Sequence, residues 1–161
     1  MSDSEAGSAP QYLHLELKTG TVKIKLRADL APKHVERVKI LAGEGFYDGT
    51  VFHRVIEGFM AQGGDPTGTG TGGSKYGNVP AEFSRSAKFL RGTVGAARTA
   101  DPNSANSQFY IMFAPSPHLD GQYTIWGEVT EGMEHVDQIK RGAGGSGAVK
   151  DPDKIISAKL G

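Results

Sequence analysis

The segment whose residue types are best suited to binding or catalysis spans residues 52–65, where two strand-like runs are joined by a short turn. If the runs fold back on each other as a hairpin, Arg54 and Gln62 share one neighbourhood with Phe59 and Met60. One fixed cation, one amide and two large apolar side chains are suited to holding a peptide. The alternative is that Phe59 and Met60 are core residues and Arg54 is a surface residue, since buried apolar side chains usually serve packing.

A glycine-rich segment follows this hairpin and invites a nucleotide-binding interpretation. Gly68, Gly70 and Gly73 formally satisfy the pattern G-x-G-x-x-G. A dinucleotide site needs a helix immediately after the pattern, but residues 74–80 make a poor helix opening, and no Walker A sequence occurs. The segment is instead predicted to be a long surface loop in which glycines let backbone pass close to backbone.

Metal and nucleophile chemistry are also poorly supported. No two histidines stand at a ligand spacing and no carboxylate cluster accompanies them, so scattered structural histidines are the better interpretation. The absence of cysteine excludes disulfides and thiolate nucleophiles, and no G-x-S-x-G elbow seats a nucleophilic serine. We therefore expect neither a metal nor a cofactor. The histidines concerned are His14, His34, His53, His118 and His135.

Composition and charge exclude several classes of partner. Lys plus Arg and Asp plus Glu both number 18, so the formal net charge is zero and nothing indicates a nucleic-acid or membrane partner. No apolar run approaches the length of a membrane span. Residues 1–10 lack the basic start and apolar stretch of a signal peptide. We expect a cytoplasmic monomer.

Alternating polarity predicts a mainly β protein of one domain. Val22, Ile24 and Leu26 alternate with basic residues, which predicts a half-buried strand, and the run before them predicts its hairpin partner. Residues 1–10 are expected to be a disordered tail and residues 11–161 a single domain. Further short strands are predicted over residues 51–56, 59–62, 93–97, 109–113, 124–129 and 155–160.

Two helices complete the predicted architecture. The first opens at Pro32, with Asp29 as its expected cap, and the second runs from about residue 132 to residue 140. Short strands with long glycine-rich connections are typical of a closed antiparallel β-barrel, and the two helices would cover its ends.

The segment at residues 52–65 closely resembles the signature of the cyclophilins, the cyclosporin-binding class of peptidyl-prolyl cis–trans isomerases. The resemblance covers about residues 12–160 and implies an eight-stranded antiparallel barrel capped by two helices. The segments 91–94 and 97–99 resemble those of the short bacterial members. The further matches are Gly70-Thr71-Gly72-Gly73, Asn106-Ser107-Gln108-Phe109-Tyr110-Ile111, Leu119-Asp120-Gly121 and Trp126-Gly127-Glu128-Val129.

This resemblance implies an enzyme that rotates Xaa-Pro bonds in proline-containing peptides and in unfolded or folding proteins. It implies that Arg54 is the catalytic residue, because a fixed cationic donor can bond to the nitrogen lone pair that appears at the twisted transition state. The alternatives are a proline-binding module without turnover, or a chaperone. The residues implied for substrate binding are Phe59, Met60, Gln62, Ala97, Arg98, Thr99, Gln108, Tyr110, His118, Leu119 and Tyr123.

Three of these positions depart from the better-known family pattern. Tyr110 stands where Phe is usual, Tyr123 where His is frequent, and His118 where many members carry Trp. An indole offers a larger apolar face than an imidazole. The sequence therefore predicts that cyclosporin binds with weakened affinity while the turnover of peptides survives.

Overall fold

Eight strands and two α-helices form the regular structure of the described residues, which in this computed structural model are 11–70, 72–143 and 146–161. The tail predicted for residues 1–10 lies outside them. The strands are β1 (Tyr12–Leu17), β2 (Gly20–Leu26), β3 (Arg54–Ile56), β4 (Met60–Gly63), β5 (Thr93–Ala96), β6 (Phe109–Met112), β7 (Ile125–Glu131) and β8 (Ser157–Leu160). The helices are α1 (Pro32–Gly43), α2 (Met133–Val136) and the short 3₁₀ helix η1 (Pro117–Leu119).

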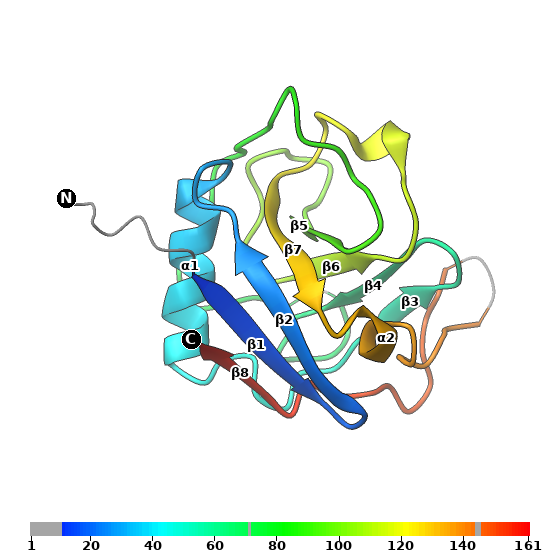
Figure 1. Cartoon of the computed structure of the whole chain (residues 1–161). Coiled ribbons are helices and arrows are strands. Elements are labelled where there is room, and N and C mark those ends of the chain that lie inside the picture. The colour runs from blue at the N-terminus through cyan, green and yellow to red at the C-terminus, as the bar shows by residue number, and fades with distance from the viewer. Residues whose placement is uncertain (1–10, 71, 144–145) are drawn as a thin grey trace.

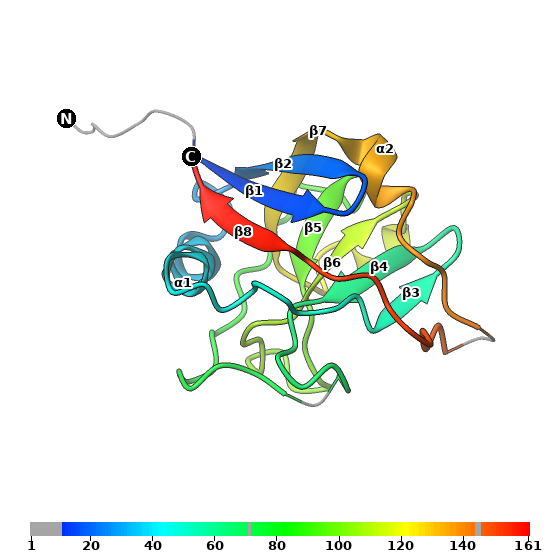
Figure 2. The same ribbon diagram turned by 90° about the horizontal axis from the view of Figure 1, so that it is seen from below.

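All strands belong to one antiparallel sheet in the order β3-β4-β6-β5-β7-β2-β1-β8 (Figure 1). The sheet curls, so that β8 comes round towards the end that carries β3 and β4 (Figure 2). Helix α1 packs against β8 and β7, and α2 packs against β2. The mainly β fold with two helices is therefore confirmed.

The closed barrel predicted from the sequence is wrong, because β3 and β8 do not pair with each other. The outer edge of β3 is taken by an irregular segment instead: Val55 donates its N–H to the Gly147 carbonyl at 2.8 Å, and Gly142 donates to the Val55 carbonyl at 2.8 Å. A further isolated bridge joins Val51 to Lys154. This irregular segment pairs with the backbone N–H and carbonyl groups at the outer edge of β3, so the sheet remains an open, curled half-barrel.

Buried apolar side chains form two clusters, which lie on opposite faces of β4 and β6. The larger one lies between the sheet and α1, and it includes a chain of edge-to-face aromatic rings centred on Phe109. The smaller one lies on the opposite face of β4 and β6, because its Tyr110 and Met112 alternate along β6 with Phe109 and Ile111 of the larger cluster, and it forms the floor under the candidate site described below. Its buried members are Met60, Phe89, Tyr110, Met112, Leu119 and Ile125.

The start of α1 is held by a residue far away in the sequence. Asp29, the predicted cap, makes no cap hydrogen bond and pairs with Arg27 at 2.8 Å. Glu82 takes its place: its carboxylate accepts the N–H of Lys33 at 3.1 Å and that of His34 at 2.8 Å. A carboxylate at this position bonds to unpaired N–H groups and complements the helix dipole.

The second helix is shorter than predicted and ends at Val136 rather than near residue 140. Arg141 donates from Nη1 to the carbonyls of Asp137 and Ile139, both at 2.7 Å. Lys140 donates its N–H to Asp153 at 2.8 Å instead of to a helical carbonyl. Side chains therefore form hydrogen bonds with backbone N–H and carbonyl groups that would have paired with each other in a longer helix.

The contact between His34 and Glu82 ties stability to pH. His34 is 4% exposed, its Nδ1 lies 2.6 Å from Glu82 Oε1, and its Nε2 is buried without a partner among the described residues. Burial lowers the pKa of His34 and outweighs Glu82, whose hydrogen bond and charge act to raise it. The folded protein therefore favours the neutral ring.

We expect the free energy of unfolding to be highest above about pH 6.5, the ordinary histidine pKa, and to fall as the pH drops below it. The unfolded chain then binds a proton that the folded ring disfavours, at a cost of at most about 1.4 kcal/mol per pH unit. Urea unfolding across this range should show a flatter pH dependence for His34→Gln than for the natural protein. Equal slopes in His34→Gln and the natural protein would contradict the prediction.

Candidate active site

The hairpin of β3 and β4 sets the position of Arg54. Arg54 and Gln62 are paired directly across the two strands, so their side chains stand on the same face of the sheet. Arg54 Nη1 donates to Gln62 Oε1 at 3.2 Å, and Nε donates to the Ser146 carbonyl at 3.0 Å. The guanidinium is exposed, so these two bonds hold it in place without withdrawing it from a ligand.

The same row continues across two more strands. Gln62 on β4 is paired with Tyr110 on β6, and Tyr110 is paired with Gly95 on β5. Opposed residues of an antiparallel sheet share a face, so the row from Arg54 to Gly95 forms one continuous surface. Residues distant in the sequence are thereby brought to a single site.

A cavity of about 150 Å³ opens on this surface. Its apolar walls are Met60 from β4, Tyr110 from β6 and Leu119 from the end of η1, each at most 7% exposed. Most of the residues predicted for the site lie here. The lining residues are Arg54, Phe59, Met60, Gln62, Ala97, Arg98, Tyr110, Leu119 and Tyr123.

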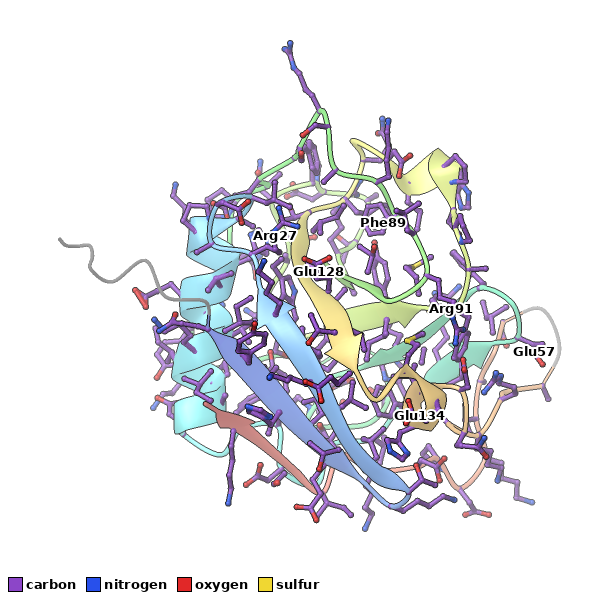
Figure 3. All side chains as sticks on the ribbon, in the orientation of Figure 1. Arg27, Glu57, Phe89, Arg91, Glu128 and Glu134 are labelled. Atoms are coloured by element: carbon purple, nitrogen blue, oxygen red, sulfur yellow. The ribbon has the colours of Figure 1, made fainter. Side chains whose placement is uncertain are left out.

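The floor of this pocket is braced by Phe89 (labelled in Figure 3), whose ring stacks on Tyr110 at 5.9 Å. Gly95 makes room for it, because a Cβ there would lie 2.8 Å from the Phe89 ring. The Tyr110 hydroxyl is buried without a partner among the described residues, and its burial raises the pKa of Tyr110. Tyr110 is therefore a neutral, rigid wall.

Two aromatic contacts form the rim. His118 does not line the pocket but packs against Phe59, with the ring centroids 5.8 Å apart. In the second contact the guanidinium of Arg98 lies 4.3 Å from the centre of the Tyr123 ring, and its Nη2 donates to the Gln122 carbonyl at 2.6 Å. Two of the three positions that depart from the family pattern, His118 and Tyr123, thus lie at the mouth of the pocket, and the third, Tyr110, is one of its walls.

A second cavity, of about 570 Å³, adjoins the first and shares Gln62, Ala97 and Arg98 with it. Thr99 and Gln108 from the predicted set lie in this polar cavity rather than in the apolar pocket. Several of its residues were not predicted as site residues, because isolated Ser and Asn residues carry no periodic signal; the pointers to this cavity were the family matches around Gly70 and Gln108. The missed side chains are Ser74, Asn78, Ser104 and Asn106.

The glycine-rich segment runs along the edge of this second cavity as the predicted loop, with no helix after it. Gly64, with a φ of 91°, comes so close to the Ser107 carbonyl that a Cβ would lie 2.7 Å from its oxygen. Asn106 bridges to the far side of the loop, accepting from the Ser74 N–H at 2.8 Å and donating to the Tyr76 carbonyl at 3.0 Å. The glycines therefore serve close backbone packing.

Charge at the site comes from two arginines. Among the described residues, neither Arg54 nor Arg98 forms an ion pair with a carboxylate. No group of three or more His, Asp or Glu residues in the described part of the chain is arranged to hold a metal ion. No helix among these residues is both long enough and apolar enough to cross a membrane. An apolar pocket beside a fixed guanidinium suits a protein that binds proline within a peptide.

Comparison with known proteins agrees with this class. The sequence model of the family described as cyclophilin type peptidyl-prolyl cis-trans isomerase/CLD matches residues 12–160. A probable peptidyl-prolyl cis-trans isomerase of Brucella suis is 55% identical over 158 residues, covering 91% of this chain and 80% of the relative.

Solved structures give the same result. The crystal structure of a cyclophilin type peptidyl-prolyl cis-trans isomerase of Cryptosporidium parvum superposes with a TM-score of 0.88 at 32% identity, covering 95% of this chain and 98% of that one. The structure of the same protein in the presence of the dipeptide Ala-Pro gives a TM-score of 0.86 at 32% identity, covering 93% of this chain and 98% of that one. The chain belongs to the cyclophilin-type peptidyl-prolyl cis–trans isomerases, which confirms the family and the activity predicted from the sequence.

Proposed function

We propose that this chain rotates Xaa-Pro bonds by holding the proline ring in the apolar pocket and presenting the Arg54 guanidinium to the imide nitrogen. The observation that carries the proposal is the fixed position of Arg54, between Gln62 Oε1 and the Ser146 carbonyl, on the rim of a pocket walled by Met60 and Leu119. A preoriented donor needs little reorganisation during the reaction.

The reaction requires a donor and no nucleophile. The planar peptide bond resists rotation with a barrier of about 18–20 kcal/mol, because its C–N bond has partial double-bond character. At the twisted transition state the nitrogen loses conjugation and regains a lone pair, to which Arg54 donates more strongly than to the planar ground state. Reducing a time of roughly 10–100 s to milliseconds requires about 7 kcal/mol of such stabilisation.

The rest of the substrate is held by the neighbouring groups. Phe59 and Tyr110 complete the contacts with the proline ring. The N–H groups of Ala97 and Thr99 already donate to the Gln108 carbonyl at 3.0 Å and to Ser104 Oγ at 2.9 Å. In our proposal the extended peptide therefore pairs with the Arg98 amide and the Ala97 carbonyl.

The clients in this proposal are proline-containing peptides and unfolded or folding proteins. The related structure that was solved in the presence of the dipeptide Ala-Pro supports a proline-containing ligand. A cytoplasmic address, a monomeric state and a single domain over residues 11–161 are also proposals. Cell fractionation and analytical ultracentrifugation test the first two, and limited proteolysis tests the third.

The direct test is exchange NMR on a short Xaa-Pro peptide with catalytic amounts of the protein. We expect cis–trans exchange to speed up, with and without a chelator, because no step of the proposed reaction uses a metal. Binding that shifts the peptide resonances without accelerating exchange would instead identify a proline-recognition module or a chaperone.

Cyclosporin binding tests the rim of the pocket. His118 is exposed and packs on Phe59, where it presents a smaller and more polar face than an indole. We expect the smaller ring to weaken the binding free energy of cyclosporin by about 1–3 kcal/mol, which is roughly a 5- to 150-fold loss of affinity. His118→Trp should restore much of the affinity and leave peptide turnover nearly unchanged.

His118→Ala provides the control, since it should bring no gain. Two calorimetric outcomes would contradict the assignment of this rim: low nanomolar binding by the natural protein, or the same Kd before and after His118→Trp.

A further inference from the structure

A buried carboxylate lies behind the site without lining either cavity. Asp65 is only 1% exposed and directly follows Gly63 and Gly64, the first of which ends β4. Its oxygens accept hydrogen bonds from the N–H and hydroxyl of Thr67 at 2.8 Å, from the Gly70 N–H at 2.5 Å and from the Gly72 N–H at 3.1 Å. Burial acts to raise the pKa of Asp65, and these hydrogen bonds outweigh it and hold the pKa below its ordinary value. The ionised carboxylate therefore holds the backbone of the loop in place.

The backbone of the loop is tightly packed at Gly70 and Gly72. A Cβ on Gly72 would lie 2.2 Å from Asp65 Oδ1, and one on Gly70 would lie 3.2 Å from His53 Nε2. Gly70 also has a φ of 92°, in the left-handed region that favours glycine. Asp65 and the glycines thus fix where the loop carbonyls point.

Those carbonyls determine the orientation of Gln108. Its Nε2 donates to the carbonyls of Gly70 and Gly72, both at 3.0 Å. A carbonyl only accepts, so the NH₂ end of the amide must face the loop and the oxygen must face away from it. Gln108 Oε1 is thereby directed at Gln62.

The same reasoning continues to the proposed catalytic residue. Gln62 Nε2 donates to Gln108 Oε1 at 3.0 Å, which leaves Gln62 Oε1 to accept from Arg54 Nη1 at 3.2 Å. A guanidinium only donates. If Gln108 turned over, Gln62 would meet an NH₂ group, and turning in response would place its own NH₂ against the guanidinium.

We propose that Asp65 is a positioning residue for the isomerisation: by fixing the loop, it orients the Gln108 and Gln62 amides so that an oxygen meets Arg54. We call this series, from Asp65 through the carbonyls of Gly70 and Gly72, Gln108 and Gln62 to Arg54, the amide relay. The inference rests on the proposed role of Arg54. It also explains why a carboxylate that lines neither cavity is buried beside the site.

The test is a double-mutant cycle in the full chain, measured by exchange NMR on an Xaa-Pro peptide. Asp65→Asn keeps the shape but places an NH₂ group opposite backbone N–H donors in either orientation of the amide, at Thr67 or at Gly70 and Gly72, so one side of the loop loses its acceptor. We expect kcat to fall about tenfold with KM changed less than about twofold, below the roughly hundredfold that an ångström of misplacement can cost. In an Arg54→Ala background the same change should lower kcat by less than about twofold, because the group that Asp65 positions is absent.

Glu82→Gln is the matched control, since Glu82 also binds two backbone N–H groups but at the start of α1. We expect it to lower stability and leave kcat within about twofold. If Asp65→Asn does not fold, Gly72→Ala disturbs the same loop, because its Cβ would meet Asp65 Oδ1, and it should give the same cycle. The Gln62 and Gln108 side-chain amide resonances should shift in both variants.

Each outcome separates the inference from the proposed function. Full activity in Arg54→Ala would overturn the role of Arg54. A large loss in Arg54→Ala together with an unchanged kcat in Asp65→Asn would overturn the relay alone. Equal losses from Asp65→Asn in both backgrounds would show a general structural role and also overturn the relay.

Discussion

Replacing Arg54 by alanine should lower kcat/KM for an Xaa-Pro peptide by about 10²–10³-fold, the range for losing one preorganised donor. The pocket walls remain, so the peptide should still bind while turnover is lost. The fold should survive because Arg54 is exposed and its two hydrogen bonds go to Gln62 and to the Ser146 carbonyl in a surface segment. Exchange NMR measures the rate and urea unfolding checks the fold.

Two further variants make this result specific. Arg54→Lys should also be poor, because an ammonium cannot bond to Gln62, the Ser146 carbonyl and the substrate with the geometry of a planar fork. Arg91→Ala removes an arginine paired with Asp137 at 2.6 Å that lines neither cavity, and it should change kcat/KM by less than about twofold. A well-folded Arg54→Ala protein with more than about half the natural activity would disprove the mechanism.

Replacing Phe109 by alanine should destabilise the protein by about 3–5 kcal/mol, as expected for a large aromatic side chain lost from a core. Phe109 is 1% exposed and meets three other rings edge to face, at centroid distances of 5.5 Å for Tyr47, 6.5 Å for Phe52 and 5.8 Å for Trp126. Such a loss is a large part of the roughly 5–15 kcal/mol that stabilises a typical domain. Urea unfolding monitored by the fluorescence of Trp126 measures it.

Phe83→Ala is the control for this experiment. Phe83 is 44% exposed, so its removal should cost less than about 1 kcal/mol. If Phe109→Ala and Phe83→Ala unfold at the same urea concentration, the aromatic chain in the larger cluster is not the centre of stability. Activity of Phe109→Ala below its unfolding transition should persist, because Phe109 lines neither cavity.

The strands and α1 were predictable because their signals are local. The alternation of Val22, Ile24 and Leu26 specifies a strand, and the spacing of Val35 and Val38 specifies one face of α1, whatever the rest of the chain does. The pocket residues on the β3–β4 hairpin were predictable for the same reason: they lie within nine positions of one another along the chain, from Arg54 to Gln62.

The remaining site residues depended on the family resemblance, because periodicity gives no sign that Tyr110, Leu119 and Tyr123 belong beside Arg54. Tyr110 joins the site through the pairing of β6 with β4, and Leu119 through a single turn of 3₁₀ helix. Several polar residues of the larger cavity, such as Ser74 and Ser104, were missed since no motif marked them.

Only the tertiary structure determined which group holds the start of α1, where α2 ends and which segment pairs with the edge of β3. Glu82 displaced Asp29 as the group that holds the start of α1, and Arg141 took the carbonyls that would have extended α2. The irregular segment at Gly147 occupied the edge of β3 and left the sheet open. In each case a group outside the element satisfied its backbone donors or acceptors. The bonds at α1 and at β3 join segments far apart in the sequence, and such bonds leave no periodic trace in the amino-acid sequence.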